Sequence, residues 1–375
     1  MKIIHLADLH LGKRVYEFSM CEDQKYILNQ ILQIIDEKKP DCIIIAGDVY
    51  DKSVPPVEAV ELLDYFLIQL SNRKLPVFII SGNHDSPERL AFGSSLMESS
   101  KVFVSPAYDG TVKKISLNDD FGAVNFYLLP FIKPTTVRQF FPDEKIEDYN
   151  DAVKAALKNL EFNKKERNVL IAHQFVTGAQ TCDSEEKTVG GMDNVSAELF
   201  YDFDYTALGH IHGPQKIIRE NIRYSGTPLK YSFSECNHKK SVLFVELKEK
   251  ENFSYECIPL KPLKDLREIK GSYDQIMLKK NYENTNTEDY VHITLTDEED
   301  IPEVFSKLRT VYKNLMKIDY DNLRTQSYMN ISENTVETAS PLELFERFYE
   351  LQNNSQLDED SRKFLISQME EIWEK

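Results

Sequence analysis

The sequence has few cysteines, and they are not spaced as paired ligands. The five are Cys21, Cys42, Cys182, Cys236 and Cys257, an odd number without a CxxC spacing. This argues against a disulfide framework and against a zinc site built from cysteine. The sequence also lacks a run of about 18 apolar residues, and it does not begin with a signal-peptide pattern. We therefore expect no membrane-spanning helix and a cytoplasmic location.

Positive charge is also in short supply. The 375 residues include 45 lysines and arginines against 62 acidic residues, which gives a formal net charge of -17. A protein that holds nucleic acid by itself usually has a basic face. Either the substrate is not a polyanion, or metal ions and a partner supply the missing positive charge. Composition by itself favours the first alternative.

What the sequence does contain is a regular alternation of strand and helix patterns. Apolar runs at 2–7, 42–46 and 77–80 are separated by helical patterns, one over 23–38 and one that follows Pro55 and Pro56. This β-α-β-α-β order is typical of a parallel sheet covered by helices. The fold class expected from the pattern is therefore α/β. Further helices are predicted at 86–97, 148–160 and 301–314, and further strands at 168–172, 205–208 and 290–296.

Side chains that can bind metal follow five of the predicted strands. They are Asp8 and His10, Asp48, Asn83 with His84, His173, and His210 with His212. Taken singly, each has a simpler explanation, because a lone histidine is more often structural and Asp48 or Asn83 could belong to a turn. Five of the eight histidines nevertheless follow apolar strands directly. Because ligands bind at the carboxyl edge of open α/β sheets, we expect one shared site there.

The residue types in this set match a site for two metal ions. Carboxylate, amide and imidazole ligands suit first-row metals such as manganese, iron or zinc. Asp48 can bridge two cations, so seven ligands with one shared make two sets of four. Two ions about 3.5–4 Å apart hold both the attacking and the leaving oxygen of an in-line displacement. The pattern therefore predicts hydrolysis of a phosphate ester.

The motifs also resemble a known family when they are taken in order. The set that carries the resemblance is Asp8-Leu9-His10, Gly47-Asp48, Gly82-Asn83-His84-Asp85, His173 and Gly209-His210-Ile211-His212. It resembles the calcineurin-like metallophosphoesterase superfamily over about residues 1–250. Within that superfamily, segments 8–12, 47–51 and 224–235 are similar to the SbcD family of bacterial nuclease subunits, which are related to the Mre-type nucleases. The resemblance implies a metallophosphoesterase β-sandwich core flanked by helices, a small α+β capping domain and C-terminal helices.

The resemblance further implies a role for each residue of the site. One metal ion would be held by Asp8, His10, Asp48 and His212, and the other by Asp48, Asn83, His173 and His210. His84 would not be a ligand; it would lie beside the phosphate, oriented by Asp51, and protonate or stabilise the leaving oxygen. Lys13 and Arg14 are candidate DNA contacts, and a solvated basic pair is the equal alternative. The expected cofactors are two manganese ions, with magnesium as the alternative.

The implied activity is manganese-dependent hydrolysis of DNA phosphodiester bonds. It would be exonucleolytic on duplex ends and endonucleolytic on single strands and hairpins, in DNA repair and recombination. The expected partners are DNA, the SbcC ATPase and a second copy of the chain. Two alternatives remain on the same fold: a cyclic-nucleotide or other small phosphodiester hydrolase, and a scaffold with a vestigial site. The segment 224–235 favours the nuclease, and the complete ligand set argues against the scaffold.

Three parts of the chain are expected from prolines and changes of pattern. Residues 1–262 would form the metallophosphoesterase nuclease domain, 268–333 the capping, DNA-binding domain, and 340–375 a pair of helices that dock on SbcC. A helix start is predicted at Ser340-Pro341, and aromatic residues follow at Phe345, Phe348, Tyr349, Phe364 and Trp373. The alternative is that these helices pack on the capping domain.

A homodimer is expected through the helical region that follows the second predicted strand. The apolar residues there are Val60, Leu63, Phe66, Leu67 and Leu70, with Leu90 and Phe92 nearby. They offer more apolar surface than one face of a sheet needs. The alternative is that they only cover the sheet.

Overall fold

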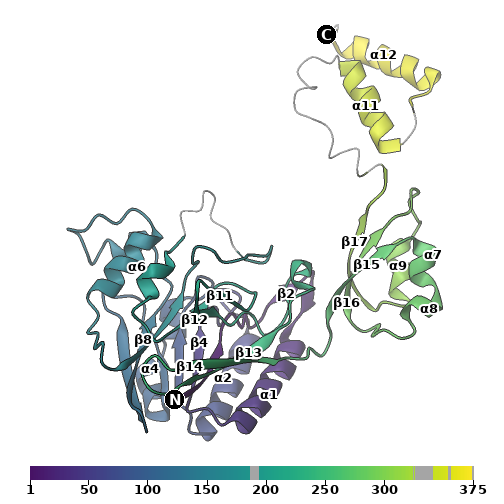
Figure 1. Cartoon of the computed structure of the whole chain (residues 1–375). Coiled ribbons are helices and arrows are strands. Elements are labelled where there is room, and N and C mark those ends of the chain that lie inside the picture. The colour runs from purple at the N-terminus through teal and green to yellow at the C-terminus, as the bar shows by residue number, and fades with distance from the viewer. Residues whose placement is uncertain (186–193, 324, 326–340, 354–355, 374–375) are drawn as a thin grey trace. The chain divides into compact units, whose positions relative to one another are not determined.

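The computed structural model describes the whole chain except residues 186–193, 324, 326–340, 354–355 and 374–375. Contacts between residues divide the chain into two units, Met1–Asp265 and Leu266–Lys375. Figure 1 shows the elements of each unit.

Two six-stranded sheets form the first unit (Figure 1). The first sheet has the order β14-β13-β1-β4-β5-β6; its strands are β14 (Phe253–Pro259), β13 (Ser241–Leu247), β1 (Lys2–Leu6), β4 (Cys42–Ala46), β5 (Val77–Ile80) and β6 (Val102–Val104). Strands β1, β4, β5 and β6 are parallel, whereas β13 pairs antiparallel with β1 and with β14.

The second sheet has the order β11-β12-β10-β9-β8-β7; its strands are β11 (Gln215–Ile217), β12 (Arg219–Tyr224), β10 (Tyr205–Gly209), β9 (Arg167–His173), β8 (Gly122–Leu129) and β7 (Lys113–Asp119). Its four central strands are parallel, so each sheet has an edge at which several strands end together.

The two sheets pack face to face around one apolar core. Every second residue of β4 (Cys42, Ile44 and Ala46) lies in this core, together with residues of β8, β9 and β10 such as Phe126 and Ile171. Side chains alternate across a strand, so the other residues of β4 point to the opposite face. A second core lies on the other face of the second sheet, where α6 (Tyr149–Lys158) packs. The expected metallophosphoesterase α/β fold is therefore built as a sandwich of two sheets covered by helices.

The predicted β-α-β-α-β order is confirmed. Helix α1 (Cys21–Lys38) connects β1 to β4 and buries Ile27, Ile31 and Ile35. Helix α2 (Val57–Asn72) connects β4 to β5 and begins directly after Pro56. Because both connections place helices against a parallel sheet, the carboxyl ends of β1, β4 and β5 meet at one edge.

Two predicted helices differ in the structure. The segment 86–97 forms two short helices, α3 (Pro87–Leu90) and α4 (Ser94–Met97), because Gly93 between them has a φ of 73° that a continuous helix cannot accept. The segment 301–314 contains only α9 (Val304–Arg309), and Asn314 already begins the next strand. Glu303, with a φ of 54°, delays the start of that helix.

The second unit contains a small α+β fold. A parallel three-stranded sheet has the order β15-β16-β17, with β15 (Leu266–Gly271), β16 (Tyr290–Leu295) and β17 (Asn314–Tyr320). Short helices α7 (Tyr273–Met277), α8 (Lys279–Tyr282) and α9 accompany it, and Val291, Ile293 and Leu308 lie in its core.

Helices α11 (Pro341–Asn353) and α12 (Glu359–Trp373) complete the chain. The helix start predicted at Ser340 lies outside the described residues, as do any side-chain contacts of Trp373. No described helix is long and apolar enough to cross a membrane.

Candidate metal centre

The predicted site residues lie at the carboxyl ends of strands from both sheets. Asp8 and His10 follow β1, Asp48 follows β4, and Asn83 and His84 follow β5. His173 ends β9 in the second sheet, and His210 and His212 follow β10. Because the two sheets pack face to face, these strand ends supply side chains from opposite sides to one place.

The loops after β1 and β4 hold their acidic and imidazole residues through the main chain. The Asp8 N–H donates to the carbonyl of Gly47 at 3.0 Å, and the His10 N–H donates to the carbonyl of Asp48 at 2.9 Å. Asp8, His10 and Asp48 have φ values of 53°, 44° and 46°, in the left-handed region that such residues adopt uncommonly. Strained backbone of this kind persists only where the surroundings hold it, and it clusters at functional sites.

Glycine makes the close approach of these loops possible at two positions. A Cβ at Gly47, where φ is 86°, would lie 2.2 Å from His173 Nδ1. A Cβ at Gly209 would lie 1.9 Å from the carbonyl oxygen of Ala46. Any side chain at either position would push the two sheets apart beneath the site.

The seven predicted ligands converge as two overlapping groups. In the first group, which contains Asp8, His10 and His212, His10 Nε2 lies 3.2 Å from His212 Nε2. Asp8 Oδ1 accepts the N–H of His210, a residue of the second group, at 2.8 Å. In the second, Asn83 Oδ1 lies 3.0 Å from His173 Nε2 and 2.9 Å from His210 Nδ1.

Asp48 is the residue that the two groups share. Its Oδ2 lies 3.3 Å from His173 Nε2 and 3.8 Å from His10 Nε2.

Burial strongly changes the charge of these groups. It raises the pKa of Asp8 to about 7 and lowers the pKa of His210 to about 3. Burial also disfavours a charged His173, but the neighbouring Asp48 carboxylate outweighs it and raises the pKa of His173 to about 9. The site is thus an unusually buried set of acids and bases that lacks balancing cations, an arrangement typical of functional sites.

The donor set fits divalent cations. Asp8 Oδ2 and His10 Nδ1 are buried and have no hydrogen-bond partner among the described residues. Nitrogen atoms of His10 and His212 face each other at 3.2 Å inside the site. Two triads, Asp8 with Asp48 and His173, and His10 with Asp48 and His84, each bring ligand atoms within 4.8 Å of one another. Mixed carboxylate, imidazole and amide donors suit first-row transition metals.

His84 lies at the edge of this group, and its orientation comes from the main chain. Its Nδ1–H donates to the carbonyl oxygen of Asp51 at 2.9 Å, and its ring meets the His10 ring edge-on at 4.8 Å. The Asp51 carboxylate instead pairs with Lys13 Nζ at 2.7 Å. The other basic candidate, Arg14, begins the short strand β2 (Arg14–Val15) and donates to the carbonyl of Glu17. Lys13 is thus connected to the site through its ion pair with Asp51. Arg14 instead bonds to the main chain three residues further along.

Several residues that support the site were missed in the sequence. The Gln24 amide on α1 accepts from the Gly12 N–H at 3.0 Å and donates to the carbonyl of His10 at 2.7 Å. Tyr231 Oη donates to the carbonyl of Leu9 at 2.7 Å. The Asp85 carboxylate accepts the N–H groups of Val49, Tyr50 and Gly82 at 2.9–3.1 Å. Tyr231, within the segment 224–235, and Asp85, in the motif Gly82-Asn83-His84-Asp85, lay in stretches that the sequence singled out, whereas Gln24 did not.

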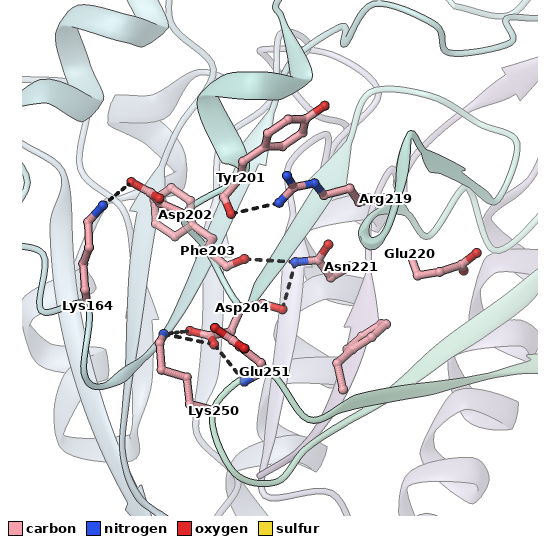
Figure 2. A pocket seen from close by; sticks show the side chains of 11 residues that line it. Lys164, Tyr201, Asp202, Phe203, Asp204, Arg219, Glu220, Asn221, Lys250 and Glu251 are labelled. Carbon is pink, nitrogen blue, oxygen red and sulfur yellow. Dashed lines mark hydrogen bonds and ion pairs between the residues drawn. The ribbon is translucent and has the colours of Figure 1, made fainter.

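A separate pocket lies at the opposite edge of the second sheet. Its volume is about 550 Å³, and Figure 2 shows the side chains that line it. Asp202 and Asp204 precede β10, Arg219 begins β12, and Lys164 precedes β9, so the pocket lies at the amino ends of these parallel strands. None of the predicted site residues lines it.

Comparisons with known proteins agree with this geometry. The family model described as calcineurin-like phosphoesterase matches residues 1–214. The model described as type 5 capsule protein repressor C-terminal domain matches residues 262–353. The chain is 35% identical over 380 residues to the D subunit of the nuclease SbcCD from Staphylococcus epidermidis, covering 98% of each chain.

Two solved structures also match. A dimetal phosphatase from Danio rerio is 11% identical, with a TM-score of 0.38 over 70% of this chain and 99% of that one. A protein of Thermus thermophilus is 12% identical, with a TM-score of 0.38 over 68% of this chain and 98% of that one.

Proposed function

Because the chain belongs to the calcineurin-like phosphoesterases and, among them, to the SbcD family of nuclease subunits, we propose that it cleaves DNA phosphodiester bonds with two manganese ions. The observation that carries the proposal is the convergence of seven donor residues, six of them buried and Asn83 half-buried, with Asp48 between the two groups. A phosphoesterase of this family hydrolyses a phosphate ester, and the named nuclease relative makes DNA the substrate to test.

For the ligands we propose the division that the resemblance to the metallophosphoesterases implies. Asp8, His10, Asp48 and His212 would hold one ion, and Asp48, Asn83, His173 and His210 the other. When bound, two such ions supply an activated water and neutralise charge on the attacked phosphate. Manganese is the metal that the family resemblance implies, and the mixed oxygen and nitrogen donors are compatible with it; magnesium is the alternative.

His84 would act on the leaving oxygen. Its Nδ1 is engaged by the carbonyl of Asp51 at 2.9 Å, which leaves Nε2 as the nitrogen that can deliver a proton. An imidazole whose second nitrogen is fixed in this way is oriented for general acid catalysis. The Asp51 side chain has a different task in this proposal, because it holds Lys13 at 2.7 Å. Lys13 could then reach a backbone phosphate while Asp51 keeps it near the site.

One assay separates this function from its alternatives. The purified protein is incubated with manganese and end-labelled duplex DNA, with a hairpin, and with a small chromogenic phosphodiester. We expect metal-dependent cleavage of both DNA substrates, and no cleavage by an Asp48→Asn variant prepared in parallel. Turnover of the small diester without cleavage of DNA would identify a small phosphodiester hydrolase instead. No turnover of any substrate would favour the scaffold.

The net charge of -17 makes a partner for DNA binding necessary in this proposal. The relative is named as the D subunit of an SbcCD nuclease, so the expected partner is the SbcC ATPase. We propose that the residues 268–333 cap the DNA and that α11 and α12 dock on SbcC. Aromatic side chains are exposed on both helices, among them Phe348 at 54% and Phe364 at 67%. Exposed aromatics of this kind are favoured anchors at protein interfaces.

The docking proposal is tested by truncation and by point variants. A chain that ends at Glu337, or one with Phe348→Ser and Phe364→Ser, should retain manganese-dependent cleavage but lose co-purification with SbcC and ATP-dependent activity. Glu350→Ala, on the same helix α11, is the control and should bind normally. Full co-purification of the double variant would rule out docking through these aromatics.

We also propose a homodimer through the region of α2 to α4, but through only some of the residues expected, among them Phe92 and Val60, which are exposed. Phe66, Leu70, Leu63 and Leu90 are buried within one chain, which corrects their assignment to the dimer surface. The exposed apolar side chains include Phe92 at 86% and Leu96 at 81%, with Val57 on α2. Burial of these residues against the same surface of a second copy is more favourable than their exposure to water.

Sedimentation tests the dimer. The double variant Phe92→Glu and Leu96→Glu should sediment as a monomer with unchanged cleavage of small substrates. Ile218→Glu is the matched control, because Ile218 is 70% exposed on the other sheet. A Phe92→Glu and Leu96→Glu variant that remains dimeric would contradict the proposed surface.

A further inference from the structure

A buried polar cluster lies directly behind His212. It consists of Ser184, Thr227, Glu235 and Lys240, which come from three separate segments of the chain. Glu235 and Lys240 are buried, and their side chains form an ion pair. Buried ion pairs seldom add stability over apolar side chains of the same size, so their presence calls for another explanation.

The cluster contacts the ring nitrogen of His212 that faces away from His10. Ser184 Oγ lies 2.8 Å from His212 Nδ1, and Glu235 Oε1 lies 3.3 Å from the same nitrogen. Ser184 Oγ also donates to Glu235 Oε1 at 2.6 Å. Because its single hydrogen goes to the carboxylate, the serine oxygen accepts at His212, and Nδ1 must carry the proton. The Nε2 lone pair is then free on the side where His10 Nε2 lies at 3.2 Å.

The same cluster also fixes the main chain of His212. Lys240 Nζ donates to the carbonyl oxygen of His212 at 2.9 Å and to Thr227 Oγ1 at 2.6 Å. The His212 N–H donates to the Glu185 carboxylate at 2.8 Å. The residue is therefore held at its N–H, its carbonyl and its outer ring nitrogen, while its inner nitrogen faces His10.

The Lys240 ammonium group determines what the cluster can bind. Cys182, His212 and Glu235 bring their ligand atoms within 4.8 Å of one another, a spacing suitable for a metal ion. However, the Lys240 ammonium group pairs directly with the Glu235 carboxylate. The negative charge that a metal ion would need is therefore already neutralised. The cluster is therefore suited to orienting His212 and not to binding an ion of its own.

We propose that Glu235, acting through Ser184 and balanced by Lys240, is a positioning residue that fixes the Nδ1–H tautomer of His212. The inference deepens the proposed function and rests on it, since His212 matters as a ligand only if the site holds metal. Hydrogen-bond partners of this kind keep a ligating imidazole in one tautomer and one orientation, and their loss typically weakens metal binding about 10–100-fold.

The test replaces the buried pair without leaving a stranded charge. Glu235→Met with Lys240→Met removes both charges and keeps similar volumes, and Ser184→Ala removes only the relay. In metal-free protein labelled with ¹⁵N-histidine, we expect wild-type His212 to be protonated at Nδ1 and both variants to contain a mixture of tautomers. Calorimetric titration with manganese should show one of two ions bound roughly 10–100-fold more weakly and the other unchanged. Glu235→Gln keeps an acceptor oxygen and should retain more of the affinity than the double variant.

A matched control is the ion pair between Asp119 and Arg167, which is also largely buried but lies at the opposite strand ends. Asp119→Asn should lower thermal stability and leave both the tautomer and manganese binding unchanged. An unchanged His212 tautomer in Glu235→Met with Lys240→Met and in Ser184→Ala would overturn the proposal, as would equal weakening of both ions. If the double variant does not fold, Ser184→Ala and Glu235→Gln decide by the same measurements. A wild-type chain that binds no manganese but shows the tautomer set by Glu235 would refute the proposed function alone.

Discussion

The parallel strands of the first unit differ in charge at their two ends. At the amino ends of β9, β10 and β12, in the pocket of Figure 2, acids and bases are paired with one another: Lys250 Nζ lies 2.9 Å from the Asp204 carboxylate, and Lys164 Nζ lies 3.0 Å from that of Asp202. At the carboxyl ends of β1 and β4, Asp8 and Asp48 are buried together, and Asp8 Oδ2 has no hydrogen-bond partner among the described residues.

The difference indicates where an external cation is needed. In the pocket, acidic side chains are already paired with lysines, so the binding of an additional ion there would gain little free energy. An acidic, imidazole-rich cluster is costly until a cation is supplied. We therefore expect changes in the pocket to affect stability alone, and changes among the buried donors at the opposite edge to affect metal binding. Four variants test this contrast.

The largest effect is expected for Asp48→Asn. The amide keeps the size of the side chain but cannot neutralise two cations, so we expect manganese binding to weaken more than roughly 100-fold and cleavage to be abolished. The metal-free variant should be less stable than the wild type, because the Asp48 carboxylate outweighs the burial of His173 and raises the pKa of that imidazole to about 9. Calorimetry with manganese and thermal unfolding measure the two quantities. Normal metal binding by the variant would show that Asp48 is not the bridging ligand.

His84→Ala should lower turnover without removing metal. General acid catalysis contributes about 10²–10⁴-fold, and we expect a loss in that range on DNA with two ions still bound. Metal analysis beside single-turnover cleavage separates the two effects. Asp51→Asn separates the two contacts of Asp51, because it keeps the carbonyl that His84 Nδ1 contacts and removes the carboxylate that pairs with Lys13. Loss of an ion from His84→Ala would mean that His84 is itself a ligand.

At the opposite edge, Asp204→Ala should affect stability alone. Its carboxylate accepts the Asn168 N–H at 2.8 Å and pairs with Lys250, so its removal leaves partly buried donors unsatisfied. We expect a loss of about 2 kcal/mol in the free energy of unfolding, measured in urea, with unchanged cleavage by the folded protein. A drop in turnover at full occupancy of the folded state would connect the pocket to catalysis and break the contrast.

The smallest effect is a change in acid sensitivity caused by Asp119. Burial pushes the pKa of this carboxyl upward, but hydrogen bonds from Arg167 and from the chain's amino group outweigh it and hold the pKa below its ordinary value. A lowered pKa in the folded state contributes stability above the unfolded value of about 4, and this contribution is lost as the pH falls below it. Asp119→Asn should therefore flatten the dependence of unfolding free energy on pH between about 5 and 3. An equally steep dependence in the variant would exclude Asp119 as its source.

The strands and their alternation with helices could be predicted because the information is local, whereas the order of the strands within the two sheets was not predicted. Apolar runs of four or five residues specify β4 and β5, and the polar residue after each run marks the edge of the sheet. The single helix predicted over 86–97 was wrong because one backbone angle, at Gly93, breaks the pattern. The dimer residues were misassigned because an apolar helical stripe does not reveal which of its members face the sheet. Phe66 is fully buried, whereas Phe92 is 86% exposed.

By itself, the sequence determined the kind of chemistry, since carboxylates, an amide and imidazoles at strand ends can serve few purposes besides binding metal. Only the tertiary structure decided how each donor is aimed. Glu235 lies 23 positions from His212 in the chain, and Tyr231 lies 222 positions from Leu9, yet both pairs are in contact. The physical reason is that ligand identity is a property of one residue, whereas tautomer, orientation and charge balance depend on partners that the fold brings together from distant segments.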